Sequence, residues 1–147
     1  MTIAYRQATE SDLTWINARY EEVNFMPSTD LSQDFLIIAE SDGTPVGVGR
    51  IVTMSTFDCE LGGMYISEGF RGMNIANEII KGLIAEAQKR FETIYCIPLP
   101  GLESIYMKRG FEKSEKEFSS LPEKLRQKYS YCEKSFGSRT LLVHKTK

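Results

Sequence analysis

The chain has 147 residues, 41% of them hydrophobic and 26% charged, which is enough for one domain with a substantial core and too little for two ordinary domains. We therefore expect a single domain over residues 1–147. No apolar stretch approaches the ~20 residues that span a bilayer and no signal pattern is visible, which predicts a soluble, cytoplasmic protein outside membranes. The net charge of −2 argues against a generally basic nucleic-acid binder.

The first part of the chain reads as a strand, a helix and a loop. Residues 3–8 form a short strand pattern, and Thr9 to Asp12 fit a capping box. Apolar residues then recur at helical spacing to about Asn24. A proline and small polar residues break this periodicity at 25–30, as a loop would.

Three strands and a long helix are expected next. Residues 35–40 and 46–54 are apolar, β-rich runs joined by the turn Ser41-Asp42-Gly43, which predicts a hairpin. A further strand at 59–66 contains Gly62-Gly63, which indicates a bulge or a close backbone approach. From Ile75 the apolar residues follow the period of an amphipathic helix.

In the last third of the chain, predicted strands and helices alternate again. A short strand at 93–97 is stopped by prolines, and a helix at 102–109 ends at Gly110. A polar segment precedes a short charged helix that opens at Leu121-Pro122, and residues 139–145 read as a last strand. This order predicts an α+β domain with a mixed sheet flanked by helices.

The segment between the strand at 59–66 and the long helix has the chemistry to bind phosphate. It reads Ser67-Glu68-Gly69-Phe70-Arg71-Gly72-Met73-Asn74-Ile75-Ala76. Backbone N–H groups at a helix start lack intrahelical partners and the helix dipole adds positive potential, so such a loop can hold a pyrophosphate. Glycine and asparagine both accept positive φ. A plain strand-turn-helix unit has the same outline, so the pattern alone leaves both interpretations open.

This loop resembles that of the GNAT superfamily of N-acetyltransferases, with Arg71 first, Ala76 last, and Asn74 in place of the usual glycine. A second segment, Ile105 to Phe111, is similar to the family signature of an aliphatic or aromatic residue, tyrosine, three residues, glycine and phenylalanine. The family often has an asparagine seven residues before this tyrosine, where this chain has Leu99.

The resemblance implies a fold and a cosubstrate. The fold would be a strongly twisted mixed sheet of six or seven strands, splayed in the middle and flanked by helices. The cosubstrate would be acetyl-CoA, bound by the strand and loop residues Met64, Tyr65, Ile66, Arg71, Gly72, Met73, Asn74, Ile75 and Ala76. Asn74 tolerates left-handed backbone, although its side chain would reshape the phosphate contact. No metal-ligand spacing occurs in the sequence, so we expect no metal.

The same resemblance implies two catalytic residues. Tyr106 would protonate the departing thiolate, and Glu60 would remove a proton from the amine directly or through water. A backbone N–H near Ile66 would stabilise the oxyanion. The alternatives are that Tyr106 is a core aromatic residue and that Glu60 faces solvent.

Other nucleophilic chemistry has little support in the sequence. The only histidine, His144, falls in the last strand, so no triad is expected. The cysteines Cys59, Cys96 and Cys132 are odd in number and widely spaced, which predicts reduced thiols. Cys59 and Cys96 lie in apolar strands and read as core residues.

The acceptor would be the primary amine of a small molecule. The resemblance implies that the end of the first helix and the loop after it cover the amine side. There Glu22, Phe25 and Met26 favour an aralkyl or polyamine-like amine, with Glu21 and Asp30 as other carboxylates. The tail is similar to tails of members that acetylate amino acids, which makes an amino acid the second candidate. Residues 1–70 carry 11 acidic and 3 basic groups, which would suit a cationic amine if the halves of the chain form separate lobes.

Two other functions remain open at this stage: a catalytically silent CoA-binding regulatory domain, and a protein N-acetyltransferase. We expect a monomer or a homodimer. The basic residues Arg126 and Lys128 would either reach the 3′-phosphate of the cofactor or only solvate the tail.

Overall fold

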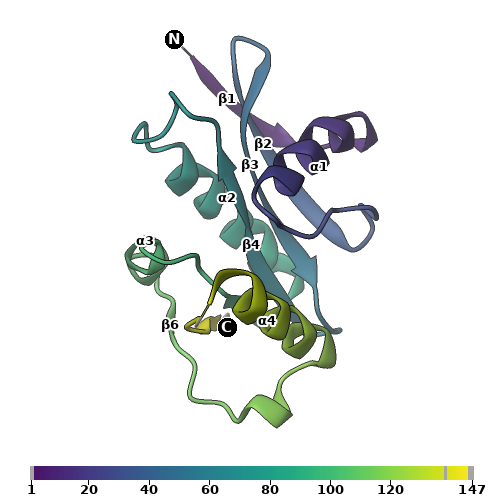
Figure 1. Cartoon of the computed structure of the whole chain (residues 1–147), viewed down its shortest axis with the longest axis vertical. Helices are drawn as coiled ribbons and strands as arrows, with labels where there is room; N and C mark the ends of the chain where they lie inside the picture. The colour runs from purple at the N-terminus through teal and green to yellow at the C-terminus, as the bar shows by residue number, and fades with distance from the viewer. Residues whose placement is uncertain (1, 138, 146–147) are drawn as a thin grey trace.

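The computed structural model describes residues 2–137 and 139–145, in which a seven-stranded mixed sheet is covered by helices (Figure 1). The strands are β1 (Ile3–Gln7), β2 (Asp34–Ser41), β3 (Thr44–Thr53), β4 (Asp58–Ile66), β5 (Thr93–Cys96), β6 (Glu112–Lys113) and β7 (Leu142–Lys145). The helices are α1 (Leu13–Glu22), α2 (Ile75–Arg90), α3 (Glu103–Met107) and α4 (Glu123–Phe136). The order of the strands in the sheet is β1-β2-β3-β4-β5-β7-β6, so the predicted α+β fold with a mixed sheet is confirmed.

Strands β1 to β4 form an antiparallel meander. The predicted hairpin between β2 and β3 turns at Asp42 and Gly43, whose φ angles are 50° and 84°. Two consecutive positive φ angles match the right-handed twist of the flanking strands, and aspartate followed by glycine is a pair that adopts them readily.

A capping box at Thr9, as the sequence predicts, opens the 3₁₀ turn Glu10–Asp12 that leads into α1. The backbone N–H of Thr9 donates to Asp12 Oδ2 at 2.7 Å, and Arg6 Nη1 lies 2.8 Å from the same oxygen. The hydrogen bond from Arg6 is the main cause that lowers the pKa of Asp12 to about 2. The helix ends at Glu22, two residues before the predicted end.

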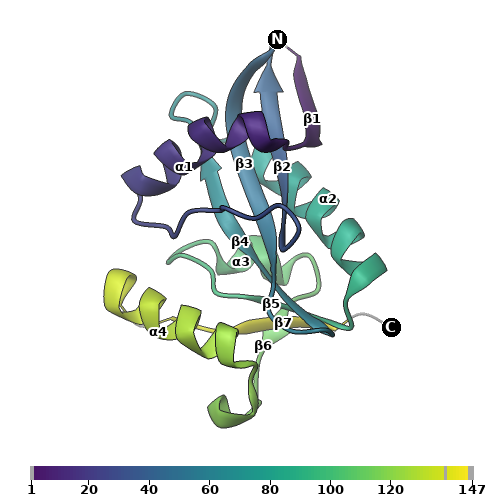
Figure 2. The same cartoon turned by 90° about the vertical axis from the view of Figure 1, so that its right-hand side faces the viewer.

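Helices α1 and α2 cover opposite faces of the sheet, and α4 lies lower on the face of α1 (Figure 2). On one face, α2 buries Ile79 and Leu83. On the other face, α1 buries Ile16 and Tyr20, and α4 buries Leu125. Residues of β3, β4 and α4 line a cavity that is described below.

The middle of the sheet is splayed. Strand β5 pairs with β4 only as far as Leu61, opposite Cys96, so the section of β4 that continues to Ile66 has no partner strand on that side. On the β3 side the register shifts between Val48 and Arg50, and Gly63 has a φ of 61°. The predicted Gly62-Gly63 irregularity is therefore a bulge at the splay, as the fold prediction requires.

The C-terminal third departs from the predicted boundaries. Helix α3 is five residues long, shorter than the predicted 102–109, and the polar segment contributes a two-residue strand, β6. Strand β7 begins at Leu142 and not at Arg139, because its partner β5 offers only four residues, Thr93–Cys96, before Pro98. The charged segment forms a 14-residue helix, α4.

Candidate active site

A long cleft of about 920 Å³ runs between the free edge of β4, the start of α2 and the region of α3. Eight of the nine residues that the sequence predicts for cofactor binding line it. The exception is Met73, which is 40% exposed and lies outside the lining. Leu99, at the position where the family often has asparagine, also lines the cleft.

The loop before α2 contains residues with left-handed backbone. Gly72 and Asn74 have φ angles of 80° and 66°, so Asn74 adopts the left-handed conformation that the sequence predicts for it. The Asn74 side chain accepts a hydrogen bond from Asn77 Nδ2 at 3.1 Å, and Asn77 accepts one from Arg109 Nε at 2.9 Å. These contacts tie the Asn74 amide to the helix, and Arg109 adds positive charge beside the helix N-terminus.

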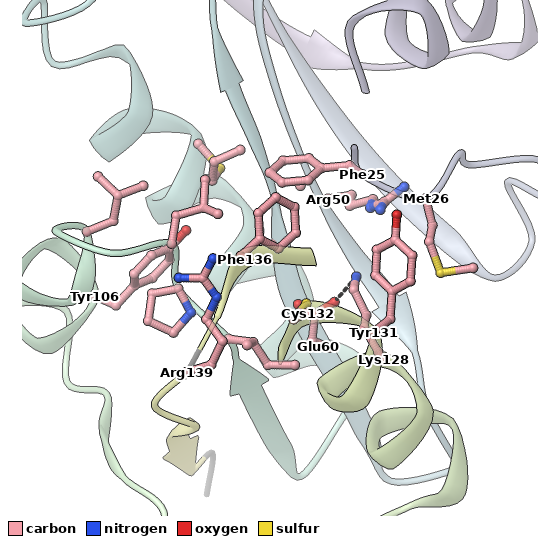
Figure 3. A pocket seen from close by; sticks show the side chains of 17 residues that line it. Phe25, Met26, Arg50, Glu60, Tyr106, Lys128, Tyr131, Cys132, Phe136 and Arg139 are labelled. Atoms are coloured by element: carbon pink, nitrogen blue, oxygen red, sulfur yellow. Dashed lines mark hydrogen bonds and ion pairs between the residues drawn. The ribbon is translucent and has the colours of Figure 1, made fainter. Parts of the chain in front are cut away.

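A second, narrower cavity lies between the loop after α1, strand β4 and helix α4 (Figure 3). We call it the acceptor cavity; its space of about 40 Å³ holds about three water molecules. It shares Phe25, Met64, Leu99, Leu102 and Tyr106 with the long cleft, so the two spaces meet at these side chains.

Glu60 is part of the wall of the acceptor cavity and is only 2% exposed, so it does not face solvent. Its Oε1 accepts a hydrogen bond from Lys128 Nζ at 2.6 Å, drawn as a dashed line in Figure 3. Its Oε2 lies against Gly62, where an added Cβ would be 2.6 Å away. Gly62 therefore makes space for the carboxylate, and Lys128 neutralises its charge.

Tyr106 is 3% exposed and its hydroxyl lies beside the Cys96 thiol. Burial raises the pKa of Tyr106 well above its usual value, and Cys96 and Glu60 raise it further. Tyr106 thus keeps its proton at ordinary pH. Burial also raises the pKa of Cys96, and of Cys59, so these thiols are inert as the sequence predicts.

The predicted acceptor residues separate into two groups. Phe25 and Met26 line the acceptor cavity. Glu22 lines neither space: it pairs with Arg19 Nε at 2.8 Å and accepts a hydrogen bond from Tyr65. Asp30 lines an outer cleft of about 560 Å³ that adjoins the acceptor cavity.

Three cations in the acceptor cavity were not predicted to act there: Arg50, Lys128 and Arg139. Arg50 had a signal in the sequence, because it is the only charged residue in an apolar strand. Lys128 and Arg139 follow from the docking of α4, which no local pattern encodes. The acidic half of the chain does not form this cavity alone, since both halves line it, and its cations outnumber its carboxylates.

Metal-binding side chains do not cluster in residues 2–137 and 139–145. No group of three or more histidine, cysteine, aspartate or glutamate side chains in this part of the chain is placed to hold a metal ion. The side chain of His144 lies outside the described residues. None of the helices described is both long and apolar enough to cross a membrane.

A sequence profile described as the Acetyltransferase (GNAT) domain matches residues 8–120. Because this match covers well over half of the chain, the chain belongs to the GNAT family of acetyltransferases. A search of curated protein sequences finds no match.

Solved structures share the fold at low sequence identity. An N-acetylglutamate synthase from Neisseria gonorrhoeae, complexed with coenzyme A and L-arginine, matches 98% of this chain with a TM-score of 0.74 and 18% identity. The chain spans only 33% of that synthase. A GNAT family acetyltransferase from Elizabethkingia anophelis with acetyl-CoA bound matches 97% of both chains, with a TM-score of 0.65 and 14% identity. The match to the ribosomal-protein-S18-alanine N-acetyltransferase from Escherichia coli covers 98% of this chain and 94% of that enzyme, with a TM-score of 0.71 and 10% identity.

Proposed function

We propose that the chain is an acetyl-CoA-dependent N-acetyltransferase that transfers the acetyl group directly to the primary amine of a small molecule. The sequence leaves two acceptor classes, an aralkyl or polyamine-like amine and an amino acid. The observation that carries the proposal is the meeting of the long cleft with the acceptor cavity at Tyr106, with buried Glu60 on the acceptor side.

The long cleft suits acetyl-CoA in both shape and charge. The N-terminus of α2, with Arg71 and Arg109 nearby, would bind the pyrophosphate. The section of β4 from Gly62 to Ile66 has no strand on its β5 side, so its outward N–H and C=O groups are free to pair with the pantetheine arm. The structures from Neisseria gonorrhoeae and Elizabethkingia anophelis, solved with coenzyme A and acetyl-CoA, support this assignment.

The amino group of the acceptor must be neutral to attack the thioester, yet an alkylamine is mostly protonated at neutral pH. Glu60 takes this proton, directly or through water; its ion pair with Lys128 uses one of several acceptor positions on the carboxylate. The amine nitrogen then bonds to the carbonyl carbon, and a backbone N–H of the free section of β4 stabilises the oxyanion. The C–S bond breaks, and the thiolate of CoA takes the proton of Tyr106. The nitrogen loses its second proton, which passes to the tyrosinate through water, so that a neutral amide is formed and Tyr106 is restored.

The high pKa of Tyr106 is compatible with the protonation of this thiolate. A thiolate that is shielded from water is a stronger base than one in water, because desolvation disfavours the charged form. Acetyl-CoA and the bound acceptor would shield the departing thiolate of CoA in this way. It can therefore accept a proton that Tyr106 holds tightly.

Acetyl-CoA turnover with a panel of amines tests the proposal against the silent regulatory domain. Released thiol is measured by a colorimetric reagent and the acetylated amine by mass. We expect one acetylated amine per thiol and no thiol release without the protein. Stabilisation by acetyl-CoA with no release above the protein-free rate would contradict the enzyme and favour the silent domain. Acetylation of peptides alone would favour a protein N-acetyltransferase.

A further inference from the structure

The acceptor cavity has an excess of positive charge. Its lining includes the cations Arg50, Lys128 and Arg139 and a single carboxylate, Glu60. That carboxylate is already paired with Lys128 at 2.6 Å. Neither arginine forms an ion pair with a carboxylate among the residues that the structure describes, although Arg50 also lines the outer cleft with Asp30 and Asp34.

Both guanidinium groups are buried and incompletely bonded. Arg50 is 3% exposed, donates from Nη1 to Ser28 Oγ at 2.7 Å and lies 4.4 Å from the centroid of the Tyr20 ring. Arg139 is 9% exposed and lies 5.0 Å from the centroid of the Phe136 ring. Within residues 2–137 and 139–145, the Nε of each arginine lacks a hydrogen-bond partner.

A buried cation normally has a paired anion, since its removal from water is otherwise costly. Figure 3 shows the two side chains reaching the cavity from different elements, Arg50 from β3 and Arg139 from the segment after α4, with Glu60 and Lys128 between them. An anionic group on the ligand would supply what the protein does not. A diamine would add two positive charges to this cavity, whereas a zwitterion adds none.

We propose that the acceptor is an aminocarboxylate, a free amino acid whose amine is acetylated while its carboxylate binds Arg139, with Arg50 contributing the second positive charge. This inference rests on the proposed acetyl transfer and selects between its two acceptor classes. Arg139 is the better ligand of the two, because its side chain makes no hydrogen bond to the described part of the chain, whereas Arg50 already binds Ser28.

The acceptor would enter through the outer cleft, which shares Met26, Arg50, Lys128 and Tyr131 with the acceptor cavity. The cavity itself is too narrow for an amino acid in this structure, so side chains at its mouth must move on binding. Met26 is 49% exposed and unbranched, which makes it the easiest of these side chains to displace.

Matched acceptors test the carboxylate directly. The twenty L-amino acids are screened at saturating acetyl-CoA, and the best one is compared with its carboxamide and with its decarboxylated amine. We expect kcat/KM for the acid to exceed that for the carboxamide by at least about 10-fold, as for a lost hydrogen bond to a charged group. Preference for the carboxamide, the plain amine or a peptide N-terminus would overturn the inference while leaving acetyl transfer intact.

The variant Arg139→Gln tests whether the preference for the carboxylate depends on this side chain. We expect it to raise KM for the acid about 10- to 100-fold and to leave the KM for acetyl-CoA and the rates with the carboxamide nearly unchanged. Arg139→Lys should retain part of the preference for the acid. Lys134→Gln, which removes an exposed charge from α4, is the control and should change neither ratio. An equal loss on acid and carboxamide would mean that Arg139 is only structural.

A binding measurement keeps the inference testable if no amine is acetylated. In that case the proposed transfer fails, and calorimetry of the same amino acids with the CoA-bound protein decides the carboxylate question. Binding that Arg139→Gln weakens supports the anion site, and the absence of any amino-acid binding overturns it.

Discussion

Tyr106 lies where the long cleft and the acceptor cavity meet, and its hydroxyl is buried beside Cys96. A tyrosine at this junction has two possible uses, packing or proton donation. Its ring packs edge-on against the ring of Phe111, with 5.7 Å between the ring centroids, and any aromatic residue could make this contact. Only the hydroxyl distinguishes the two uses, so removal of that single atom is informative.

Tyr106→Phe should lower kcat by about 10²- to 10⁴-fold with little change in acetyl-CoA binding, because it removes only a proton donor. Since the pKa of Tyr106 is raised above its usual value, its ionisation should cause no loss of rate up to pH 10 in the unmodified protein. Tyr5→Phe, at a 39% exposed position on β1, is the control. Full turnover of Tyr106→Phe across the pH range would rule out the acid role.

Lys128→Met should destabilise the fold by about 3 kcal/mol, because it leaves the buried Glu60 carboxylate without its counter-charge. The double variant Glu60→Gln, Lys128→Met should recover part of this loss, since no isolated charge remains. Urea unfolding of the unmodified protein, the two single variants and the double variant forms a double-mutant cycle, which measures the coupling free energy between Glu60 and Lys128. A double variant as unstable as the sum of the two single variants would mean that the ion pair contributes nothing.

The bulge in β4 brings the backbone at Gly63 close to Tyr20 of α1 and to Arg50 of β3. Gly63 sits at the register shift with a φ of 61°, and an added Cβ would lie 2.6 Å from the Tyr20 hydroxyl and 2.8 Å from Arg50 Nε. The bulge therefore holds the cavity wall close to α1, just beyond the point where the pairing of β4 with β5 ends at Leu61.

Gly63→Ala should lower the free energy of unfolding by about 2–3 kcal/mol, through backbone strain and the clash with Tyr20 and Arg50. Gly69→Ala is the matched control: its φ is 93°, but nothing lies within 4 Å of its added Cβ. The difference between the two variants in urea unfolding isolates the clash. Equal destabilisation would mean that Gly63 matters only for its backbone angle.

The elements themselves follow closely from local patterns. The capping box at Thr9, the turn at Asp42-Gly43 and the amphipathic period of α2 each depend on neighbouring residues, so the sequence predicts them well. The last strand was predicted three residues too long, because its length depends on β5, a partner about 50 residues away. Pairing over such distances leaves no local signal.

At the scale of the whole molecule, the two halves of the site differ in how far the sequence predicts them. The loop before α2 and Tyr106 lie in contiguous motifs, and all but Met73 of the residues predicted to bind the cofactor line the long cleft. The acceptor cavity depends on how α4 docks, which places Lys128 against Glu60 although 68 residues separate them. Arg139 and Lys128 could not be assigned to the cavity without that packing.

Thermal unfolding with and without saturating acetyl-CoA tests most directly whether the long cleft is the cofactor site. Acetyl-CoA at about 100 times its Kd should add about 2.7 kcal/mol to the free energy of unfolding, which corresponds to a rise in Tm of roughly 8 °C. A rise of this size would support the cleft between β4 and α2 as the acetyl-CoA site. An unchanged Tm at millimolar acetyl-CoA would contradict cofactor binding and, with it, the proposed acetyl transfer.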